Sequence, residues 1–284
     1  DRAEVAQTAY ELALAHGELG DDARKKQLLE RALAIEERDL GRDHADLAIT
    51  LMHLGQVYAT TGEHAKRVVV LERALAIEER EYGPAHTDLV SSLNNTGVAY
   101  SEIGDHERAL TLFSRALAIE EREDTVDSST LHNVGGAYFG LQNYEEASHV
   151  FDRALELDMD KHGEKGAEIV ASILLLGSAH EALEELHTAY ELYQHALAID
   201  PSSQACKEAL ARVAPPSDDL TDGLVEIERH ALKHGELVVS SGSVVDAHVS
   251  AIVNAANEKC LGGSGVDGAI TKAGGTQLAE ARNA

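Results

Sequence analysis

The chain has 284 residues, 44% of them hydrophobic and 26% charged, which is typical of soluble globular proteins. Acidic residues outnumber basic residues by 50 to 24, and the formal charge of −26 argues against non-specific binding to nucleic acids or anionic membranes. The 2 cysteines give no disulfide framework, and no apolar run approaches the length of a membrane span, so we expect a cytoplasmic protein. Because the chain starts at Asp1 without a Met, we expect it to be a fragment of a longer protein.

One phrase recurs five times in the first 214 residues, at intervals of 42, 42, 38 and 42 residues. A helical hairpin of about forty residues buries its apolar face only by stacking on its neighbours. We therefore predict an all-α helical-hairpin solenoid over residues 1–214, with five repeats, a four-residue deletion before the fourth, and a capping helix at 203–214. The phrase ERALAIEER or a relative of it occupies residues 30–38, 72–80, 114–122, 152–160 and 194–202.

A second landmark follows the same period and pairs a glycine with a large residue three positions later. Glycine has no side chain, so it allows a neighbouring helix to approach the backbone closely, and the large residue fills the gap one turn later. Gly62-Glu63 and Gly104-Asp105 predict turns in which a glycine is followed by an acidic N-cap. The pairs are Gly55 and Tyr58, Gly97 and Tyr100, Gly135 and Tyr138, and Gly177 and His180.

These features resemble the tetratricopeptide repeat, and LGRDHADLAITLMHLGQVY and YGPAHTDLVSSLNNTGVAY are similar to its kinesin-light-chain variety. Lys25 and Arg67 stand where the family places a small residue, so these hairpins must splay or let the long side chain extend to solvent. The resemblance implies a concave groove for a peptide or a partner protein. Its lining would include Met52, His53, Asn94, Asn95, His132, Asn133, Leu174 and Leu175.

The amides of Asn94, Asn95 and Asn133 are suited to holding the backbone of an extended peptide. The alternative is that these polar residues lie on an exposed helix face and are simply hydrated. The residue types alone leave both interpretations open.

Pro215-Pro216 ends the helical periodicity and begins a second unit, residues 215–284. The apolar spacing of LVEIERHALKHG predicts a helix over 224–235, followed by two strands in 236–257 and a helix over 266–275. His230 and His234 have the i, i+4 spacing of metal ligands on a helix, but no third ligand accompanies them. We interpret them as a surface pair and predict no metal site.

A strand, a glycine-rich loop and a helix in this order can bind a diphosphate through backbone N–H groups. Residues 263–268 formally satisfy the GxGxxG pattern of nicotinamide-binding folds. However, residues 254–260 separate this pattern from its strand, and the acidic ribose partner would fall near or beyond residue 284. This context argues against a nicotinamide site.

IVNAAN, LGGSGVDGAI and AGG, in this order, resemble the macro domain, an ADP-ribose-binding module, and in particular its hydrolase and O-acetyl-ADP-ribose deacetylase branch. The resemblance implies a three-layer α/β/α fold, with ADP-ribose as ligand or substrate and no cofactor. In this branch Asn257 would contact the distal ribose and Asp267 would orient the attacking water. The implied ADP-ribose-binding residues are Ser243, Val244, Asn254, Asn257, Gly262, Gly263, Ser264, Gly265, Val266 and Asp267.

Two residues depart from the family pattern. Ser243 stands where the family has the Asp that binds the adenine amino group, which weakens that contact. Ser264 replaces a glycine and crowds the loop.

Asp267 also fits an ordinary placement at a helix N-terminus. About 61 residues are too few for a whole α/β/α domain, so we expect an incomplete macro domain.

Three functional hypotheses follow from this sequence. The intact protein could be an ADP-ribosyl hydrolase, an ADP-ribose-binding module, or a scaffold that acts only through its groove. For these 284 residues the scaffold ranks first, because strands without their sheet partners cannot offset the entropy of the chain.

Overall fold

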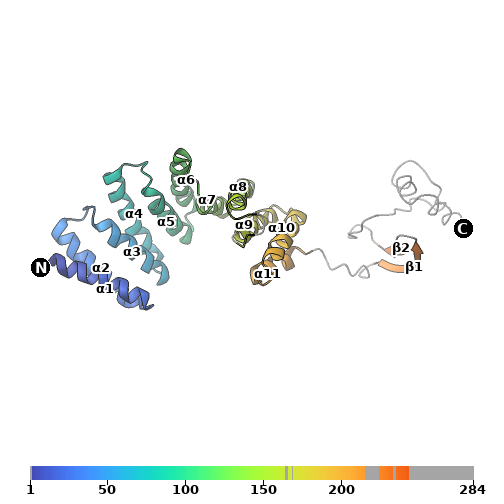
Figure 1. Cartoon of the computed structure of the whole chain (residues 1–284), viewed down its shortest axis with the longest axis horizontal. Coiled ribbons are helices and arrows are strands. Elements are labelled where there is room, and N and C mark those ends of the chain that lie inside the picture. Colours follow the sequence, from blue (N-terminus) through green and yellow to red (C-terminus); the bar gives the residue numbers. More distant parts are fainter. Residues whose placement is uncertain (1, 164–165, 168, 215–223, 233–234, 243–284) are drawn as a thin grey trace. The chain divides into compact units, whose positions relative to one another are not determined.

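The computed structural model describes residues 2–163, 166–167, 169–214, 224–232 and 235–242 (Figure 1). The chain divides into two units, Asp1–Val213 and Ala214–Ala284, which are described separately here. The described part of the first unit is helical, as predicted. Its helices are α1 (Arg2–Glu18), α2 (Asp22–Leu40), α3 (Leu47–Thr60), α4 (His64–Tyr82), α5 (Leu89–Glu102), α6 (His106–Glu123), α7 (Ser128–Gly140), α8 (Tyr144–His162), α9 (Ile169–Ala182), α10 (Leu186–Ile199) and α11 (Gln204–Val213).

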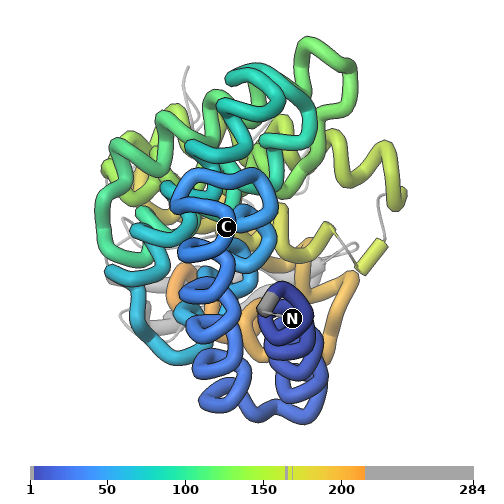
Figure 2. The backbone as a smooth tube through the Cα atoms, turned by 90° about the vertical axis from the view of Figure 1, so that its left-hand side faces the viewer, coloured from blue at the N-terminus to red at the C-terminus, as the bar shows by residue number. Residues whose placement is uncertain are grey.

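The helices pack as five successive hairpins, from α1/α2 to α9/α10, and each hairpin also contacts the next. Figure 2 views the array from its N-terminal end, where α1 and α2 lie side by side. The last hairpin is covered by α11, whose Cys206, Ala209 and Val213 are buried. The predicted helical solenoid is therefore confirmed.

The four-residue deletion is spread over three elements at the junction of the third and fourth repeats. Helix α6 has 18 residues, whereas α4 and α8 have 19. Helix α7 has 13 residues, whereas α5 and α9 have 14. The connection between α6 and α7 is residues 124–127, and the equivalent connection between α4 and α5 is residues 83–88. The spacing of sixteen residues between the glycine of the first helix and the ring it faces is therefore the same in the third hairpin, Gly97 and Phe113, and in the fourth, Gly135 and Phe151.

The repeating glycines mark the closest approach between the two helices of a hairpin. A Cβ built on Gly135 would lie 2.5 Å from Cε1 of Phe151, sixteen residues later on α8, and Gly97 and Gly177 meet Phe113 and Tyr193 in the same way. The predicted close approach is confirmed. The space directly over the glycine is filled by a side chain of the second helix, and Tyr58 and Tyr100, one turn later, are themselves buried.

The turns contain the expected glycines, with φ of 72° at Gly62 and 80° at Gly104. Asp105 caps α6 by accepting a hydrogen bond from the backbone N–H of Arg108 at 3.2 Å. Glu63 occupies the N-cap position of α4, but its side chain makes no cap hydrogen bond. The expectation of an acidic side-chain cap is therefore correct for Asp105 and wrong for Glu63.

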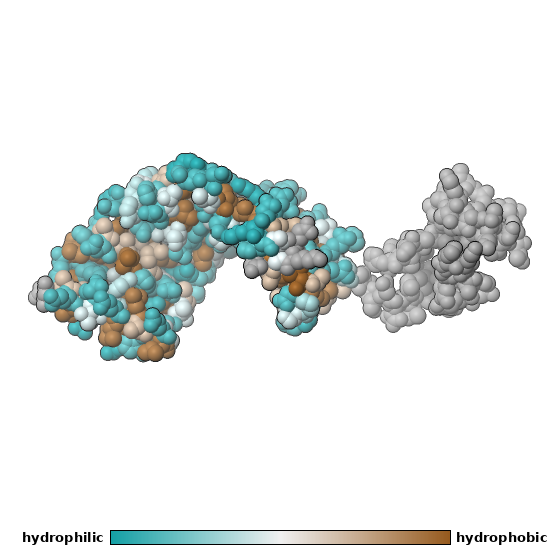
Figure 3. Space-filling view, in the orientation of Figure 1, coloured by the Kyte–Doolittle hydropathy of each residue, from teal (hydrophilic) through white to brown (hydrophobic). Residues whose placement is uncertain are grey.

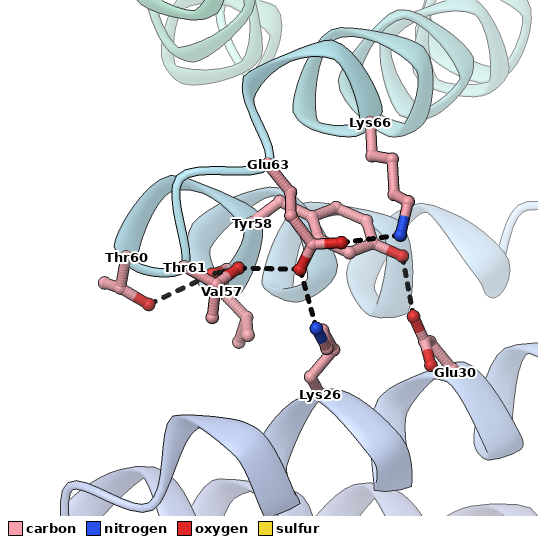
Figure 4. A network of polar contacts seen from close by, with 8 residues as sticks. All are labelled: Lys26, Glu30, Val57, Tyr58, Thr60, Thr61, Glu63 and Lys66. Carbon is pink, nitrogen blue, oxygen red and sulfur yellow. Dashed lines mark hydrogen bonds and ion pairs between the residues drawn. The ribbon is translucent and has the colours of Figure 1, made fainter.

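Glu63 instead links two repeats (Figure 4). Its carboxylate accepts hydrogen bonds from Lys26 of α2 at 2.6 Å, from Lys66 of α4 at 2.5 Å and from the Thr61 hydroxyl at 3.0 Å. These donors, first of all Lys26, lower the pKa of Glu63 to about 2. A Glu is long enough to reach the preceding repeat, whereas the shorter Asp105 reaches its own helix N-terminus.

The long residues at the small-residue positions extend their charged ends to polar partners. Arg67 is buried and forms an ion pair with Glu102 of α5. Lys25 donates from Nζ to Oε1 of Gln56 at 3.2 Å. The expectation that the side chain extends to solvent fits Lys25, whose contact with Gln56 is exposed, and is wrong for Arg67, which is 8% exposed and reaches into the next repeat.

The described part of the second unit is a hairpin of β1 (Leu224–Leu232) and β2 (Gly235–Gly242). The strands are antiparallel, with Leu224 opposite Gly242 and Leu232 opposite Gly235. The predicted helix over 224–235 is therefore wrong. Val225 and Ile227 alternate with Glu226 and Glu228, a period of two that the helical interpretation overlooked. Among the described helices of the chain, none is long and apolar enough to cross a membrane.

Candidate peptide-binding groove

The predicted groove residues come in pairs from the first helix of each of four repeats, α3, α5, α7 and α9. The structure leaves all eight partly exposed, between the fully buried core positions that precede and follow them in each helix. Met52, His53 and Asn95 line one cavity, and Asn94 contacts Asn133 of the next pair. We call this surface the groove; it consists of Met52, His53, Asn94, Asn95, His132, Asn133, Leu174 and Leu175.

Several polar groups of the groove already bind neighbouring repeats. Asn94 Nδ2 donates to the Thr130 hydroxyl at 2.8 Å, and Oδ1 of Asn94 lies 3.5 Å from Nδ2 of Asn133. The His132 ring shares a 2.8 Å hydrogen bond with the Ser172 hydroxyl. The amides of Asn94 and Asn133 therefore lie together, and one hydrogen of Asn94 is used within the array.

His53 and Asn95 line a shared cavity of about 340 Å³ together with Met52. The His53 ring lies edge-on to Tyr10 of α1, with centroids 5.4 Å apart, and Nδ1 of His53 lies 3.2 Å from the Tyr10 hydroxyl. Asn95 Nδ2 lies 3.5 Å from the Ser91 hydroxyl of its own helix, at the limit for a hydrogen bond. Asn95 therefore remains available to an incoming peptide.

A larger cavity of about 610 Å³ adjoins this one at the α1–α4 end of the array, and we call it the first cavity. Tyr10 lines it and connects it to His53. Its walls carry carboxylates and apolar side chains, and no Lys, Arg or His is among the lining residues that the structure describes. The carboxylates are Glu36, Asp39, Asp46, Glu78 and Glu81, and the large apolar side chains are Tyr10, Ile35, Leu40, Ile49, Ile77 and Tyr82.

A series of carboxylates that was not predicted from the sequence joins successive repeats. The hydroxyl of Thr50 lies 3.2 Å from Oε1 of Glu36, and the hydroxyl of Thr130 lies 2.9 Å from Oε1 of Glu120. Ser172 donates to Asp158 in the equivalent position. The signal was available, since these acids are the first Glu of the repeated IEE and its Asp counterpart, and a hydroxyl residue follows 14 residues after Glu36 and Glu78.

Burial sets the protonation behaviour of this series. Burial raises the pKa of Glu36, Glu78 and Glu120, although hydrogen bonds from Thr50, Ser92 and Thr130 oppose the rise. Burial also lowers the pKa of His132, against the attraction of Asp158. Hydroxyl-bound carboxyls thus lie beneath the groove, and the lowered pKa of His132 favours a neutral ring within it.

The predicted ADP-ribose residues, from Ser243 to Asp267, lie outside the described residues, and so does His234 of the His pair. His230 lies on β1, so the interpretation of the pair as neighbours on a surface helix is wrong. Within the described ranges, no group of three or more His, Cys, Asp or Glu side chains is arranged to hold a metal ion.

Comparison with known families supports the two-part organisation. Two family models, both described as tetratricopeptide repeat, match residues 5–46 and 47–88, and residues 70–122 and 127–202. A third, the macro domain, matches residues 253–284.

Solved structures share the fold of the array. A putative kinesin light chain with nearly identical TPR-like repeats from Podosopora anserina has a TM-score of 0.62 and 22% identity, over 72% of this chain and 98% of that one. BtubC (BKLC) from P. vanneervenii has a TM-score of 0.59 and 21% identity, over 71% of this chain and 82% of that one.

Curated relatives match only the C-terminal part. A macro domain-containing protein of Caldanaerobacter subterraneus is 64% identical over 39 residues, 14% of this chain and 22% of the relative. An O-acetyl-ADP-ribose deacetylase of Enterobacter cloacae is 52% identical over 46 residues, 16% of this chain and 26% of the relative. The chain thus spans about a quarter of the length of these relatives. The chain belongs to the tetratricopeptide repeat proteins of kinesin-light-chain-like fold, and it also carries part of a macro domain.

Proposed function

We propose that the array is a protein-interaction scaffold that holds an extended segment of a partner protein in the groove. The observation that carries this proposal is the row of partly exposed pairs on α3, α5, α7 and α9, which continues through Tyr10 into the first cavity. The amides of Asn94, Asn95 and Asn133 supply both donors and acceptors, which an extended backbone requires.

Photo-crosslinking tests the groove. A benzoylphenylalanine would replace either His53, in the groove, or Val69, which is 64% exposed on α4 and lines neither of the two cavities. Each full-length variant would be irradiated with a phage-displayed library of random peptides. We expect position 53 to capture a convergent set of peptides and position 69 to capture none above background. Equal capture at both positions, or none at position 53, would overturn the proposal.

We further propose that residues 215–284 form the first part of a three-layer α/β/α macro module that binds ADP-ribose. The support is the macro domain match over residues 253–284 and the ordered motifs that contain Asn257 and Asp267. In this proposal Asn257 contacts the distal ribose, and Gly262, Gly263 and Gly265 surround a phosphate through their backbone N–H groups.

Hydrolysis of ADP-ribose esters is a second candidate function. It is favoured by the similarity to a relative named O-acetyl-ADP-ribose deacetylase. Asp267 would position the attacking water, because a carboxylate near the scissile ester can orient a water and accept its proton. In the intact protein, Asp267→Ala should abolish release of ADP-ribose while ADP-ribose binding is retained. Loss of binding and turnover together would mean that Asp267 acts in binding.

Calorimetric titration of ADP-ribose into this chain, with Asn257→Ala as the control, tests the module itself. Heat that the substitution removes would support an ADP-ribose-binding module in these 284 residues. No heat would leave the groove as the working part of this chain, and the scaffold alone as its function.

A further inference from the structure

The first cavity has an unbalanced charge. Five carboxylates line it and no described lining residue is basic, although Arg38 pairs with Asp39 at 3.0 Å and His44 lies 3.6 Å from Asp46. The surrounding array does not compensate, since residues 1–214 hold 40 acidic and 19 basic residues, a formal charge of −21. The charge of Asp46 contributes to the raised pKa of Glu36, after burial, and the charge of Glu36 contributes in the same way to that of Tyr10. The lining glutamates, Glu36, Glu78 and Glu81, therefore make the cavity acidic.

The two innermost carboxylates each keep an acceptor without a donor. Glu36 binds the Thr50 hydroxyl through Oε1, but its Oε2 is buried and has no hydrogen-bond partner. Oε2 of Glu78, one repeat later, is likewise buried and unpartnered. Buried acceptors are almost always satisfied in folded proteins, and neither of these oxygens finds a donor among the described residues.

The equivalent carboxylates of the next two repeats do not share this feature. Glu120 uses both oxygens, accepting from the Thr130 hydroxyl at 2.9 Å and from the backbone N–H of Asp127 at 3.4 Å. Asp158 accepts from Ser172, and its Oδ2 lies 3.8 Å from His132 Nε2. Glu36, Glu78, Glu120 and Asp158 occupy the same position of four repeats. Among these four carboxylates, a buried oxygen without a hydrogen-bond partner is found only in Glu36 and Glu78, which line the first cavity.

Apolar side chains accompany these acids. Leu40, Ile49 and Tyr82 line the cavity and are 45%, 60% and 51% exposed. Brown apolar and teal hydrophilic surface alternate over the α1–α4 end of the array in Figure 3. An occupant that matches both features must carry cationic donors and apolar groups along one segment.

We propose that the first cavity selects a basic and apolar peptide segment, whose Lys or Arg side chains pair with the carboxylates that line it, Glu36, Glu78 and Glu81 among them. Flanking apolar side chains pack against Leu40, Ile49 and Tyr82. This inference rests on the proposed function of the groove and specifies the chemistry of its partner. A divalent cation fits less well, because no three metal-ligating side chains within the described residues are arranged to hold one. A peptide also explains the exposed apolar wall, which an ion does not.

Fluorescence anisotropy with defined peptides tests this inference on the full chain. The probes are three labelled peptides of alternating sequence, Lys-Leu, Gln-Leu and Glu-Leu. The double variant Glu36→Gln, Glu78→Gln removes the two charges and keeps the side-chain shape. The double variant Glu145→Gln, Glu146→Gln removes the same charge from exposed positions of α8 that line neither cavity.

We expect the Lys-Leu peptide to bind most tightly, and to lose about tenfold or more in affinity in the Glu36/Glu78 variant, as expected for lost hydrogen bonds to charged groups. The Glu145/Glu146 variant should bind it within about twofold of the original chain, because exposed charges more than a Debye length away, about 8 Å, are largely screened at physiological salt. Equal weakening in both variants would reveal diffuse attraction to the acidic chain and overturn the inference.

The outcomes separate this inference from the groove itself. If position 53 captures library peptides but these show no basic preference, or if the Gln-Leu or Glu-Leu peptide binds as tightly as Lys-Leu, the groove stands and the basic specificity is refuted. If position 53 captures no peptide, the groove itself fails.

Discussion

The adjacent glycines of α7 provide a matched pair of substitutions. A Cβ on Gly135 would meet the Phe151 ring, with Cε1 at 2.5 Å, Cδ1 at 2.7 Å and Cζ at 3.0 Å. A Cβ on Gly136 would meet nothing within 4 Å. Alanine at either position should favour the helix equally, so the two variants differ only in packing. Comparing Gly135→Ala with Gly136→Ala therefore isolates the close approach of α7 and α8.

The expected magnitudes follow from two terms. Replacing a helical glycine by alanine stabilises by about 1 kcal/mol. Overpacking a core contact costs about 1–3 kcal/mol, because the ring of Phe151 is fully buried and has little room to move. We expect Gly136→Ala to gain about 1 kcal/mol, and Gly135→Ala to fall about 1–3 kcal/mol below it.

Urea unfolding of the full chain, followed by far-ultraviolet circular dichroism, measures the difference. Combining Gly135→Ala with Phe151→Leu should show a coupling between the two sites, since the smaller side chain relieves the contact. Equal stability of the two alanine variants, or no coupling with Phe151, would refute the claim that the repeated glycine exists for helix approach.

Two further predictions concern caps and carboxylates. Asp105→Ala should cost about 1 kcal/mol of stability, because it removes the cap hydrogen bond from the backbone N–H of Arg108. Asn143→Ala should cost less, because Asn143 is at an N-cap position but its side chain makes no cap hydrogen bond. Equal losses of the free energy of unfolding in urea would contradict the assignment of Asp105 as a cap. Burial raises the pKa of Glu120 above 4.5, so the stability provided by its protonated form is complete at low pH and is lost as pH rises through the folded-state pKa. Glu120→Gln should therefore gain stability relative to the original chain between acidic and neutral pH. The hydrogen bond from Arg212 lowers the pKa of Glu181, so Glu181→Gln should show the opposite trend and lose stability as pH rises. If the free energies of unfolding of the two variants, relative to the original chain, change with pH in the same direction, the opposite pKa shifts of Glu120 and Glu181 are contradicted.

The array was predictable from the sequence because its determinants are local and repeated. The phrase ERALAIEER and its relatives predict the second helix of each hairpin. A glycine such as Gly97 or Gly135 predicts where the first helix approaches the second. What was missed depends on side-chain reach across repeats. Glu63 was expected to cap its helix, but it is long enough to reach Lys26. The spacing of residues along the sequence does not indicate how close Glu63 lies to Lys26 of the preceding repeat.

The second unit was harder to predict because its signals conflict. Residues 224–232 contain apolar residues that fit a helix and an alternation that fits a strand, and the pairing with residues 235–242 decides between them. Pairing across a turn is a non-local property. The groove positions were named from the resemblance, whereas the carboxylates of the first cavity became apparent only when Glu36 and Glu78 were seen beside Leu40, Ile49 and Tyr82.

Hydrogen–deuterium exchange of the full chain, with and without a peptide captured at position 53, tests the proposed groove most directly. We predict slower exchange in the first helices of successive repeats, α3, α5 and α7, with unchanged exchange in the central turns of α4, α6 and α8. Protection confined to the second helices, or absent from the array while the peptide is bound, would contradict it.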